Sequence, residues 1–323
     1  MNGLSKGSVT WTEVDESSDQ QRIDNFLLRT LKGVPKSHVY RILRSGEVRV
    51  NSHRVDAAYR LQVGDRIRIP PVRKGEPGKT VAVSRSLPPL AARALLEDDW
   101  LLAIDKPAGV AAHGGSGVSL GVIERLRLER PQLRFLELVH RLDRDTSGVL
   151  LLAKKRSALT ALHAQLRQGG VEKRYLVLVV GRWNERSRSV ALPLKKYLTR
   201  SGERRVVVDQ SGMAAHTVFR LLSQWRGFSL LEAQLKTGRM HQIRVHLSHL
   251  GFPIVGDDKY GDFTVNRELS HTGVKRMFLH AARIVFRHPD SGQRVRIDSP
   301  LPADLQAFID HLEAKGVAAP DNG

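Results

Sequence analysis

The hydrophobic residues near the start of the chain recur at two different spacings. In residues 22–45 they return every three or four positions, which places them on one face of a helix: Ile23, Phe26, Leu27 and Leu31, then Val39, Ile42 and Leu43. Gly33-Val34-Pro35 separates the two stretches, and Gly46 is placed to end the second helix. In residues 48–51 and 66–69 apolar and polar residues alternate, as in strands. The pattern predicts a small unit of two helices followed by strands.

Residues 95–313 have a different pattern, in which apolar runs of strand length are scattered among stretches with helical spacing. The runs lie at residues 101–104, 149–153, 175–180, 230–235 and 284–286. Strands and helices do not alternate regularly. We therefore expect an α+β fold, with a mixed or largely antiparallel sheet and helices packed on it. After two prolines, the last apolar residues of this region recur at helical spacing and predict a helix: Leu305, Phe308, Ile309 and Leu312.

Composition divides the chain between these two patterned regions. Residues 70–89 are rich in Pro, Gly, Lys, Arg and Ser and show little periodicity, which is typical of a linker. We predict an N-terminal tail over residues 1–20, a small basic domain over 21–72 and a linker over 73–94. A larger domain over 95–315 and a C-terminal tail over 316–323 complete the predicted organisation.

The charge of the chain indicates its class of partner. The sequence has 52 Lys and Arg residues against 33 Asp and Glu, a formal net charge of +19. Residues 22–73 alone hold twelve basic residues against four acidic ones. Such an excess most often neutralises phosphates, so we predict a nucleic acid partner, with an anionic membrane surface second. A solvated helix face is the alternative for any single run. In the small domain we expect phosphate contacts from Arg22, Lys36, Arg41, Arg44 and Arg49.

Several classes of protein are disfavoured by what the sequence lacks. There is no cysteine, and therefore no disulfide, thiolate nucleophile or cysteine-ligated metal. Residues 1–18 have no apolar core of signal-peptide length, and the longest apolar runs are too short to span a membrane. No phosphate loop, dinucleotide fingerprint, Gly-x-Ser-x-Gly elbow or H-E-x-x-H pattern occurs. We expect a cytoplasmic protein without membrane contact, cofactor or metal.

The polar segment Leu138-Val139-His140-Arg141-Leu142-Asp143-Arg144-Asp145-Thr146-Ser147-Gly148 is the strongest candidate for chemistry. It runs directly into the apolar strand predicted over 149–153, and catalytic groups are often held on loops beside a rigid sheet. Asp143 there could act as a nucleophile or base. By spacing alone, an ordinary surface ion pair between Asp143 and its neighbouring arginines is the commoner arrangement.

Two resemblances to known families change that balance. Residues 23–27 and 37–51 resemble an S4-type RNA-binding domain, a family that binds structured RNA. His140-Arg141-Leu142-Asp143 with Thr146-Ser147-Gly148 resembles the signature of the RluA family of pseudouridine synthases. The likeness covers residues 95–315. Within it, further segments agree with the family pattern in the same order: 106–109 with His113, 173–175, 237–246, 256–261 and 279–281. The run 135–157 is most similar to the C-type bacterial members of this family, which act on 23S ribosomal RNA.

The RluA resemblance implies that a uridine is isomerised by breaking the bond from N1 to the ribose and rejoining the sugar at C5. It implies that Asp143 is the catalytic carboxylate, that Arg244 pairs with it and that Tyr175 stacks on the target base. Arg141 would fill the space left by the flipped base, since a planar guanidinium can stack and hydrogen-bond at once. Arg239, in the same segment as Arg244, is expected to contact RNA. By propensity alone Tyr175 could equally be a strand aromatic in the core, and Arg244 an exposed helical arginine.

The expected partner is 23S ribosomal RNA or an assembling large-subunit particle, and we expect a monomer. The alternative interpretation is a non-catalytic RNA-binding or ribosome-assembly factor of the same fold. The net charge and the S4-like unit fit this interpretation equally well. The set Asp143, Tyr175 and Arg244 argues against it, since a pure binder has no physical need of that set. A nucleic-acid hydrolase ranks last, because the sequence shows neither a cluster of metal-ligating carboxylates nor a Ser/His arrangement.

Overall fold

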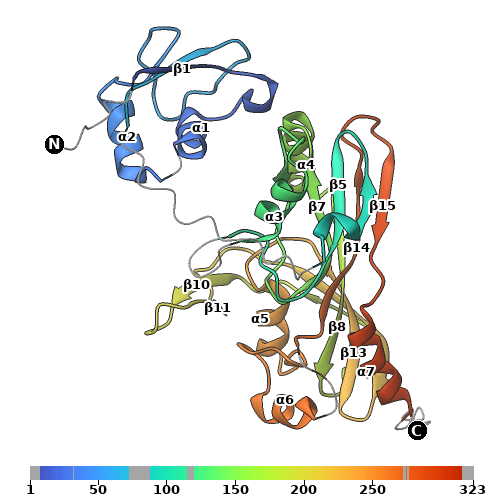
Figure 1. The fold of residues 1–323 in the computed structure, drawn as a ribbon. Helices are drawn as coiled ribbons and strands as arrows, with labels where there is room; N and C mark the ends of the chain where they lie inside the picture. Colours follow the sequence, from blue (N-terminus) through green and yellow to red (C-terminus); the bar gives the residue numbers. More distant parts are fainter. Residues whose placement is uncertain are drawn as a thin grey trace, which may run out of the picture. The chain divides into compact units, whose positions relative to one another are not determined.

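The chain divides into two compact units, Met1–Ser86 and Leu87–Gly323. The computed structural model describes residues 8–31, 33–72, 88–114, 120–271, 274 and 276–314 (Figure 1). Most of the predicted linker, the predicted C-terminal tail and the glycines at 115 and 117 lie outside these residues.

The first unit packs two helices on a small antiparallel sheet. The helices are α1 (Ile23–Thr30) and α2 (Lys36–Arg44), preceded by a 3-10 turn at Glu16–Ser18. The sheet has the order β1 (Thr10–Glu13), β3 (Arg66–Ile69), β2 (Arg49–Val50). The apolar stripes of both helices and the inward residues of β2 and β3 form one buried cluster. The helical spacing in the sequence therefore identified the core-facing side of each helix correctly.

One element of this unit was not expected. The sequence predicts a tail at residues 10–13, whereas they form β1 and pair with β3 from Thr10↔Ile69 to Glu13↔Arg66. The strand has four residues and buries none of them, so it leaves no hydrophobic alternation in the sequence. Backbone hydrogen bonds to β3, rather than side-chain burial, hold it in place.

The second unit is built on one large sheet. Its strand order is β4-β5-β7-β14-β8-β13-β12-β9, with β15 beside β14 and β6 beside β7, and β10 and β11 form a separate hairpin. All pairings are antiparallel except that of β7 with β14. The strands are β4 (Ala94–Glu97), β5 (Leu101–Lys106), β6 (Glu137–Leu138), β7 (Ser147–Ala153), β8 (Glu172–Val180), β9 (Ser187–Val190), β10 (Leu194–Leu198), β11 (Arg204–Val208), β12 (Thr217–Trp225), β13 (Phe228–Leu235), β14 (Leu279–Arg287) and β15 (Arg294–Asp298). This largely antiparallel sheet with helices on it is the α+β fold that the sequence predicted.

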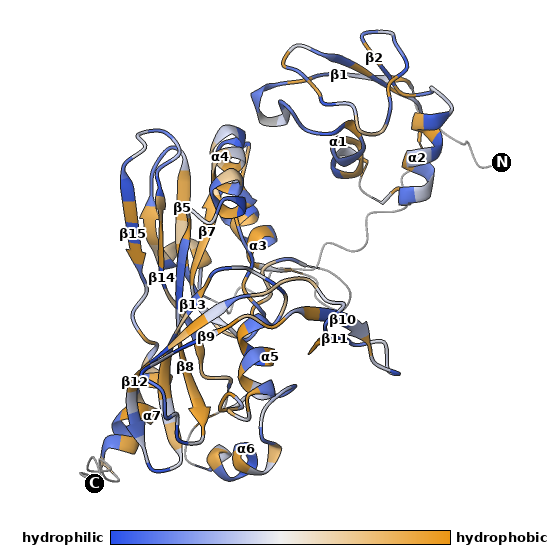
Figure 2. Ribbon diagram, turned by 180° about the vertical axis from the view of Figure 1, so that it is seen from behind, coloured by the Kyte–Doolittle hydropathy of each residue, from blue (hydrophilic) through white to orange (hydrophobic). Residues whose placement is uncertain are grey.

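Helices cover both faces of the sheet. They are α3 (Val122–Glu129), α4 (Arg156–Arg167), α5 (Gln242–His249), α6 (Phe263–Ser270) and α7 (Ala303–Ala314), with a 3-10 turn at Leu90–Arg93. Strand β7 is buried along its whole length. Leu150 and Leu152 pack in the cluster that contains α3 and α5, while Val149 and Leu151 pack in the cluster that contains α4. Figure 2 shows the resulting hydrophobic colour of the central strands.

The loop that carries Asp143 ends where β7 begins its parallel contact with β14. Only two residue pairs form it, His280↔Ser147 and Ala281↔Gly148. Gly148 has a φ of 109°, and a Cβ built on it would lie 2.3 Å from the carbonyl oxygen of Ala281. A side chain at this position is therefore excluded both by the backbone conformation and by the neighbouring strand. Asp143 lies five residues upstream, so this close approach fixes the base of the loop that carries it.

We predict that Gly148→Ala destabilises the second unit by about 2 to 4 kcal/mol, because the strands must separate to admit the methyl group. Gly169→Ala is the matched control: its φ is 75° and its Cβ would meet no atom within 4 Å. Only the conformational cost of about 1 kcal/mol should appear there. Urea unfolding of both variants checks the difference, and equal losses would contradict the role of the close approach.

Candidate active site

The backbone of the loop that carries Asp143 is held by hydrogen bonds from Lys106. This lysine ends β5 and is fully buried. Its ammonium donates hydrogen bonds to the carbonyl oxygens of Pro107 (2.9 Å), Val110 (2.8 Å) and Arg144 (3.0 Å). The backbone N–H of Gly109 donates to the same Arg144 carbonyl at 2.9 Å. The segment 106–110 therefore holds the loop immediately after Asp143.

The charge state of Lys106 depends on two opposed effects. Burial lowers its pKa to about 7, while the nearby carboxylates of Asp145 and Asp143 act in the opposite direction. Three acceptors surround the amino group, and only the ammonium form has three hydrogens to donate. The geometry therefore fits the charged form.

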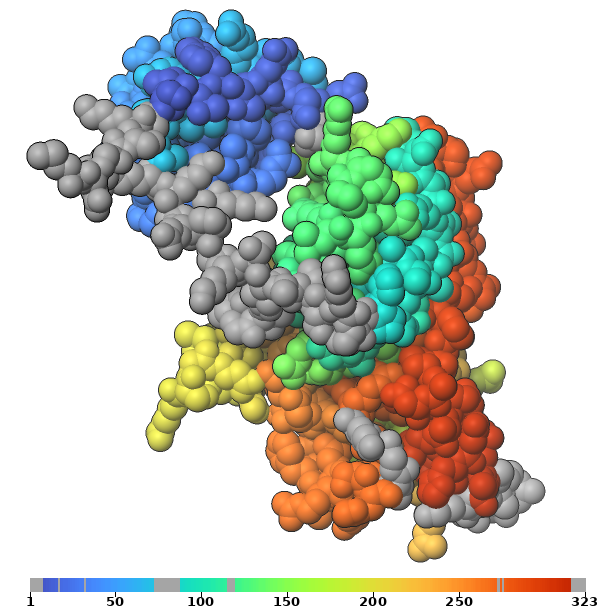
Figure 3. All heavy atoms as spheres, viewed as in Figure 1, coloured from blue at the N-terminus to red at the C-terminus, as the bar shows by residue number. Residues whose placement is uncertain are grey.

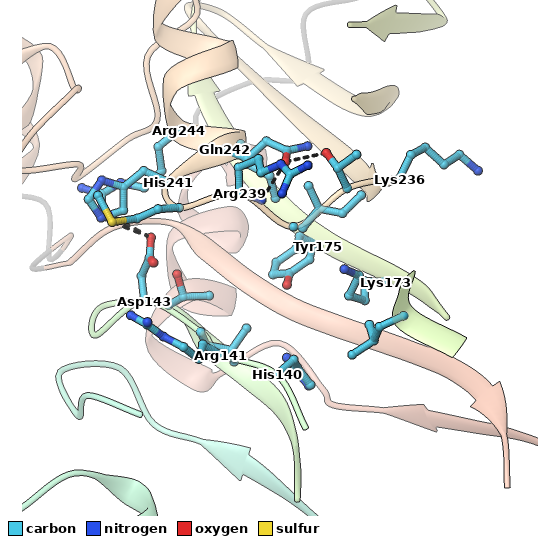
Figure 4. A pocket seen from close by; sticks show the side chains of 18 of the residues that line it. His140, Arg141, Asp143, Lys173, Tyr175, Lys236, Arg239, His241, Gln242 and Arg244 are labelled. Carbon is cyan, nitrogen blue, oxygen red and sulfur yellow. Dashed lines mark hydrogen bonds and ion pairs between the residues drawn. The ribbon is translucent and has the colours of Figure 1, made fainter. Parts of the chain in front are cut away.

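Asp143 faces the N-terminal end of α5 across the mouth of the pocket in Figure 4. Its Oδ2 atom lies 3.5 Å from Nη1 of Arg244. The arginine side chain is 3% exposed, whereas the aspartate side chain is 29% exposed. The two residues are 101 positions apart in the sequence and are brought together by the strand β7 and the helix α5. Arg244 is therefore buried, and the alternative of an exposed helical arginine is excluded.

The closest partner of Arg244 is not Asp143 but Asp257, which is fully buried. Arg244 Nε and Nη2 donate to the two oxygens of Asp257 at 2.7 and 2.6 Å, a bidentate pair. Asp257 also accepts the backbone N–H groups of Lys259 and Tyr260. Burial raises the pKa of this carboxyl, but the Arg244 hydrogen bonds and charge outweigh it and hold the pKa below its usual value. Burial acts to lower the pKa of Arg244, and the three nearby aspartates more than reverse this.

The sequence predicts no role for Asp257. It lies in the segment 256–261, which is part of the RluA resemblance, beside a second aspartate at 258 whose side chain is 59% exposed. Sequence alone does not tell which of two adjacent aspartates is buried. The signal that was present is the glycine before it: Gly256 has a φ of 74° and packs on the Arg276 carbonyl, which turns Asp257 inward.

Tyr175 lies on β8, on the same side of the sheet as α5, and faces the pocket. Its side chain is packed in the main hydrophobic cluster and the residue is 6% exposed. Burial, together with the charge of Asp143, raises the pKa of its hydroxyl, so the ring stays neutral. Tyr175 is therefore both a core residue and part of the pocket wall, and its stacking on a target base stays a prediction.

The pocket around these residues has a volume of about 1370 Å³. Besides Asp143, Tyr175 and Arg244 it is lined by a set of basic side chains: Arg141, Arg167, Lys173, Lys196, Arg204, Lys236 and Arg239. Two of them come from the hairpin β10–β11, which projects from the second unit (Figure 3). Such a wall favours a polyanion. The structure thus brings together five of the predicted site residues: Asp143, Tyr175, Arg244, Arg141 and Arg239.

The other predicted RNA-contacting residues belong to the first unit. Arg22 forms an ion pair with the buried carboxylate of Asp24, with 2.7 Å between Nη2 and Oδ2. The same carboxylate accepts a hydrogen bond from the Tyr40 hydroxyl. Arg41 pairs with Glu47 at 3.0 Å, both exposed. Arg49 donates to the carbonyl oxygen of Gly46. Lys36 and Arg44 are exposed on α2. Contact of these five residues with RNA stays a prediction.

The histidines of α5 do not converge on one point. His241 lines the pocket, His246 is buried between Thr217 and the Leu192 carbonyl, and His249 is exposed. Among the described residues no group of three or more His, Asp or Glu side chains is placed to share a metal ion. No helix in the described part of the chain is long and apolar enough to cross a membrane.

Comparison with known proteins identifies the fold and the reaction. Residues 100–249 match the model of the RNA pseudouridylate synthase family, and residues 21–67 match the S4 domain. The chain is 53% identical over 310 residues to the ribosomal large subunit pseudouridine synthase C of Escherichia coli K12, covering 94% of this chain and 97% of that protein. The chain belongs to the RluA family of RNA pseudouridine synthases. It is therefore an isomerase with an S4 domain in front of its catalytic domain.

Further members of the family support this assignment. The pseudouridine synthase C of Pasteurella multocida is 48% identical over 94% of both chains. Among solved structures, human RNA pseudouridylate synthase domain containing 4 aligns with a TM-score of 0.58 and 25% identity, over 69% of this chain and 94% of that one. The α+β fold of the catalytic domain is thus the pseudouridine synthase fold.

We predict that Asp257→Asn destabilises the catalytic domain by about 3 to 5 kcal/mol at neutral pH, because it leaves a buried guanidinium without its counter-charge. The folded pKa of Asp257 is lowered, so the pair contributes stability above the usual value of 3.8, and this contribution is lost as the pH falls through the lower folded value. Urea unfolding against pH should therefore show the variant and the wild type converging in acid. Asp258→Asn, at the exposed neighbour, is the matched control and should change little. A pH-independent difference would rule out the ion pair as its cause.

Proposed function

We propose that this enzyme isomerises specific uridines in the 23S RNA of the large ribosomal subunit, with Asp143 as the catalytic carboxylate. The observation that carries the proposal is the approach of Asp143 to Arg244 in a basic pocket whose wall includes Tyr175. Support for the target comes from the E. coli and Pasteurella relatives, which are named ribosomal large subunit pseudouridine synthases and match along almost the full chain.

The reaction needs an ionised carboxylate next to the sugar. Cleaving the bond between N1 and the ribose and forming a bond from the ribose to C5 requires a nucleophile or base at this point. Arg244 places a positive charge 3.5 Å from the Asp143 carboxylate, and Asp257 keeps the guanidinium in place. The product is an isomer of the substrate, so the chemistry balances without a redox partner or group donor.

A uridine inside folded RNA must leave its stack before this bond is accessible. Tyr175 offers a ring at the pocket wall on which the flipped base can stack. Arg141 lies in the catalytic loop two residues before Asp143 and is exposed, so its guanidinium is free to enter the vacated space in the RNA. The basic pocket rim and the S4 domain would hold the phosphates on either side.

Mapping pseudouridine in cellular RNA with and without this protein tests the proposal directly. We expect the loss of pseudouridine at a small number of positions in 23S RNA. An unchanged large-subunit RNA with losses in another RNA would reject the target while leaving the activity intact. Comparing free 23S RNA with assembling particles as substrates of the purified enzyme would then show which of them it uses.

We predict that Asp143→Asn abolishes pseudouridine formation while RNA affinity stays within about threefold, because phosphate contacts dominate binding. Asp145→Asn is the matched control in the same loop, where the carboxylate pairs with the exposed Arg144. It should retain most of the wild-type rate. Single-turnover rates and filter-binding affinities of both variants check this, and turnover by the Asp143 variant would remove Asp143 from its proposed role.

We also predict that deletion of residues 1–86 leaves a folded catalytic domain with residual activity on a short RNA but much weaker use of long ribosomal RNA. These residues form their own compact unit, and their charge adds affinity as a tethered second contact does. The slope of log affinity against log salt should also become shallower, since phosphate contacts are lost. Equal turnover and equal slopes for both proteins on the same long RNA would show that the S4 domain does not bind the substrate.

A further inference from the structure

Asp143 has a second neighbour at the oxygen that approaches Arg244. Nε2 of His241 lies 3.9 Å from Oδ2 of Asp143, and Nη1 of Arg244 lies 3.5 Å from the same oxygen. In Figure 4 both residues are labelled on the α5 side of Asp143, and a dashed line runs from its carboxylate toward them. Within the described part of the chain, Oδ1 of Asp143 makes no hydrogen bond or ion pair. The two oxygens of this carboxylate are therefore not equivalent.

Tyr260 determines which nitrogen of His241 carries the hydrogen. Its hydroxyl oxygen accepts the backbone N–H of Val206 at 2.9 Å and lies 2.8 Å from Nδ1 of His241. The other ring nitrogen faces a carboxylate, which favours a hydrogen on Nε2. Nδ1 of the neutral ring is then an acceptor, and the Tyr260 hydroxyl donates to it. The Val206 hydrogen bond leaves the hydroxyl hydrogen free for this donation.

The surroundings of His241 favour the neutral ring. Burial is the main effect that lowers its pKa, and the charges of Arg244 and Lys259 act in the same direction, while Asp143 and Asp257 oppose them. The ring centres of His241 and Tyr260 lie 5.5 Å apart in an edge-on arrangement. The Arg244 guanidinium lies 5.1 Å from the centre of the Tyr260 ring. Tyr260 thus contacts both groups that approach Asp143.

The backbone of His241 is held in an unusual conformation. Its φ of 53° and ψ of 21° are left-handed, at the N-cap position immediately before α5. Outside glycine this region costs free energy and tends to be kept where a side chain must point in a particular direction. Here it directs the imidazole toward Asp143 while Gln242 and Arg244 continue the helix.

We propose that His241 is a positioning residue of the reaction: its Nε2–H, oriented by Tyr260, engages Oδ2 of Asp143 together with Arg244 and leaves Oδ1 as the oxygen that meets the uridine. The inference rests on the proposed role of Asp143. At 3.9 Å the two atoms are too far apart for a hydrogen bond in the free enzyme, and catalytic contacts of this kind often tighten only when substrate is bound. The same hydroxyl of Tyr260 accepts from β11, so the hairpin at the pocket rim helps to set the imidazole.

Two substitutions separate the donor from the fold. In His241→Gln the amide nitrogen takes the place of Nε2 and can still donate to Asp143. In His241→Asn it takes the place of Nδ1, next to Tyr260, and the donor to Asp143 is lost. Asparagine adopts the left-handed conformation more readily than glutamine, so backbone strain favours the variant that should be less active.

We expect His241→Asn to lower kcat by about tenfold to a hundredfold with KM nearly unchanged, the effect of losing a donor to a charged group. His241→Gln should stay within about threefold of the wild type, as expected where a donor is kept. His249→Asn and His249→Gln, at the exposed histidine of the same helix, are the controls and should show wild-type kinetics. Wild-type kcat in His241→Asn, or equal losses in both His241 variants with a raised KM, would overturn the proposal.

Nitrogen NMR of the imidazole rings gives a readout that does not depend on turnover. With the His241 signals assigned by their absence from the variants, the wild type should show a hydrogen on Nε2 and a bare Nδ1. Tyr260→Phe keeps the ring beside Arg244 but removes the hydroxyl, and should yield a mixture of tautomers together with a lower kcat. A wild-type ring with the hydrogen on Nδ1 would refute the proposal.

Asp143→Asn, assayed beside these variants, separates the two possible failures. If it remains active, the proposed role of Asp143 fails and the inference fails with it. If it is inactive while His241→Asn turns over at the wild-type rate, only the inference about His241 is wrong.

Discussion

The site depends on a buried ion pair, Arg244 with Asp257, whose two side chains are 3% and 0% exposed. A guanidinium removed from water needs a compensating charge and hydrogen-bond acceptors, and Asp257 provides both. Because the pair is bidentate, it fixes the plane of the guanidinium as well as its position. The remaining nitrogen, Nη1, is then directed at Asp143. The strong pair organises the arginine, and the weaker and longer contact is left for the group that reacts.

On the other side of the pocket, too, the groups that anchor the structure differ from the group that reacts. Asp143 lies on a short loop that Lys106 and the Gly109 N–H hold through the backbone carbonyl of Arg144, so the side chain of Asp143 takes no part in this anchoring. The carboxylate retains partial exposure and one oxygen without a protein partner among the described residues. Anchoring by backbone and by buried neighbours leaves the reactive group accessible, as pre-organised sites require.

The parts of the molecule that were predicted from the sequence are those that depend on burial patterns or on a matched motif. The stripes on α1 and α2 and the buried run of β7 were recognised because their side chains form the core. The partnership of Asp143 and Arg244 was available only through the family resemblance, since 101 residues separate them. The resemblance includes Asp257 and Tyr260 but implies no role for either. Their partners come from other elements, and no local spacing reveals which side chain of Gly256-Asp257-Asp258-Lys259-Tyr260 turns inward.

The contact between Gly148 and Ala281 joins strands 133 residues apart, and it also bears on when the enzyme becomes active. A chain emerging from the ribosome presents β7 long before β14 has been made. Until β14 pairs with it, the start of β7 after the Asp143 loop has a neighbouring strand on one side only, β5, and β8 also lacks one of its two partners. Contacts of such sequence separation form late in folding because the long loop between them must close first. The catalytic geometry is therefore withheld from the nascent chain until nearly its whole length, through residue 281, has been synthesised.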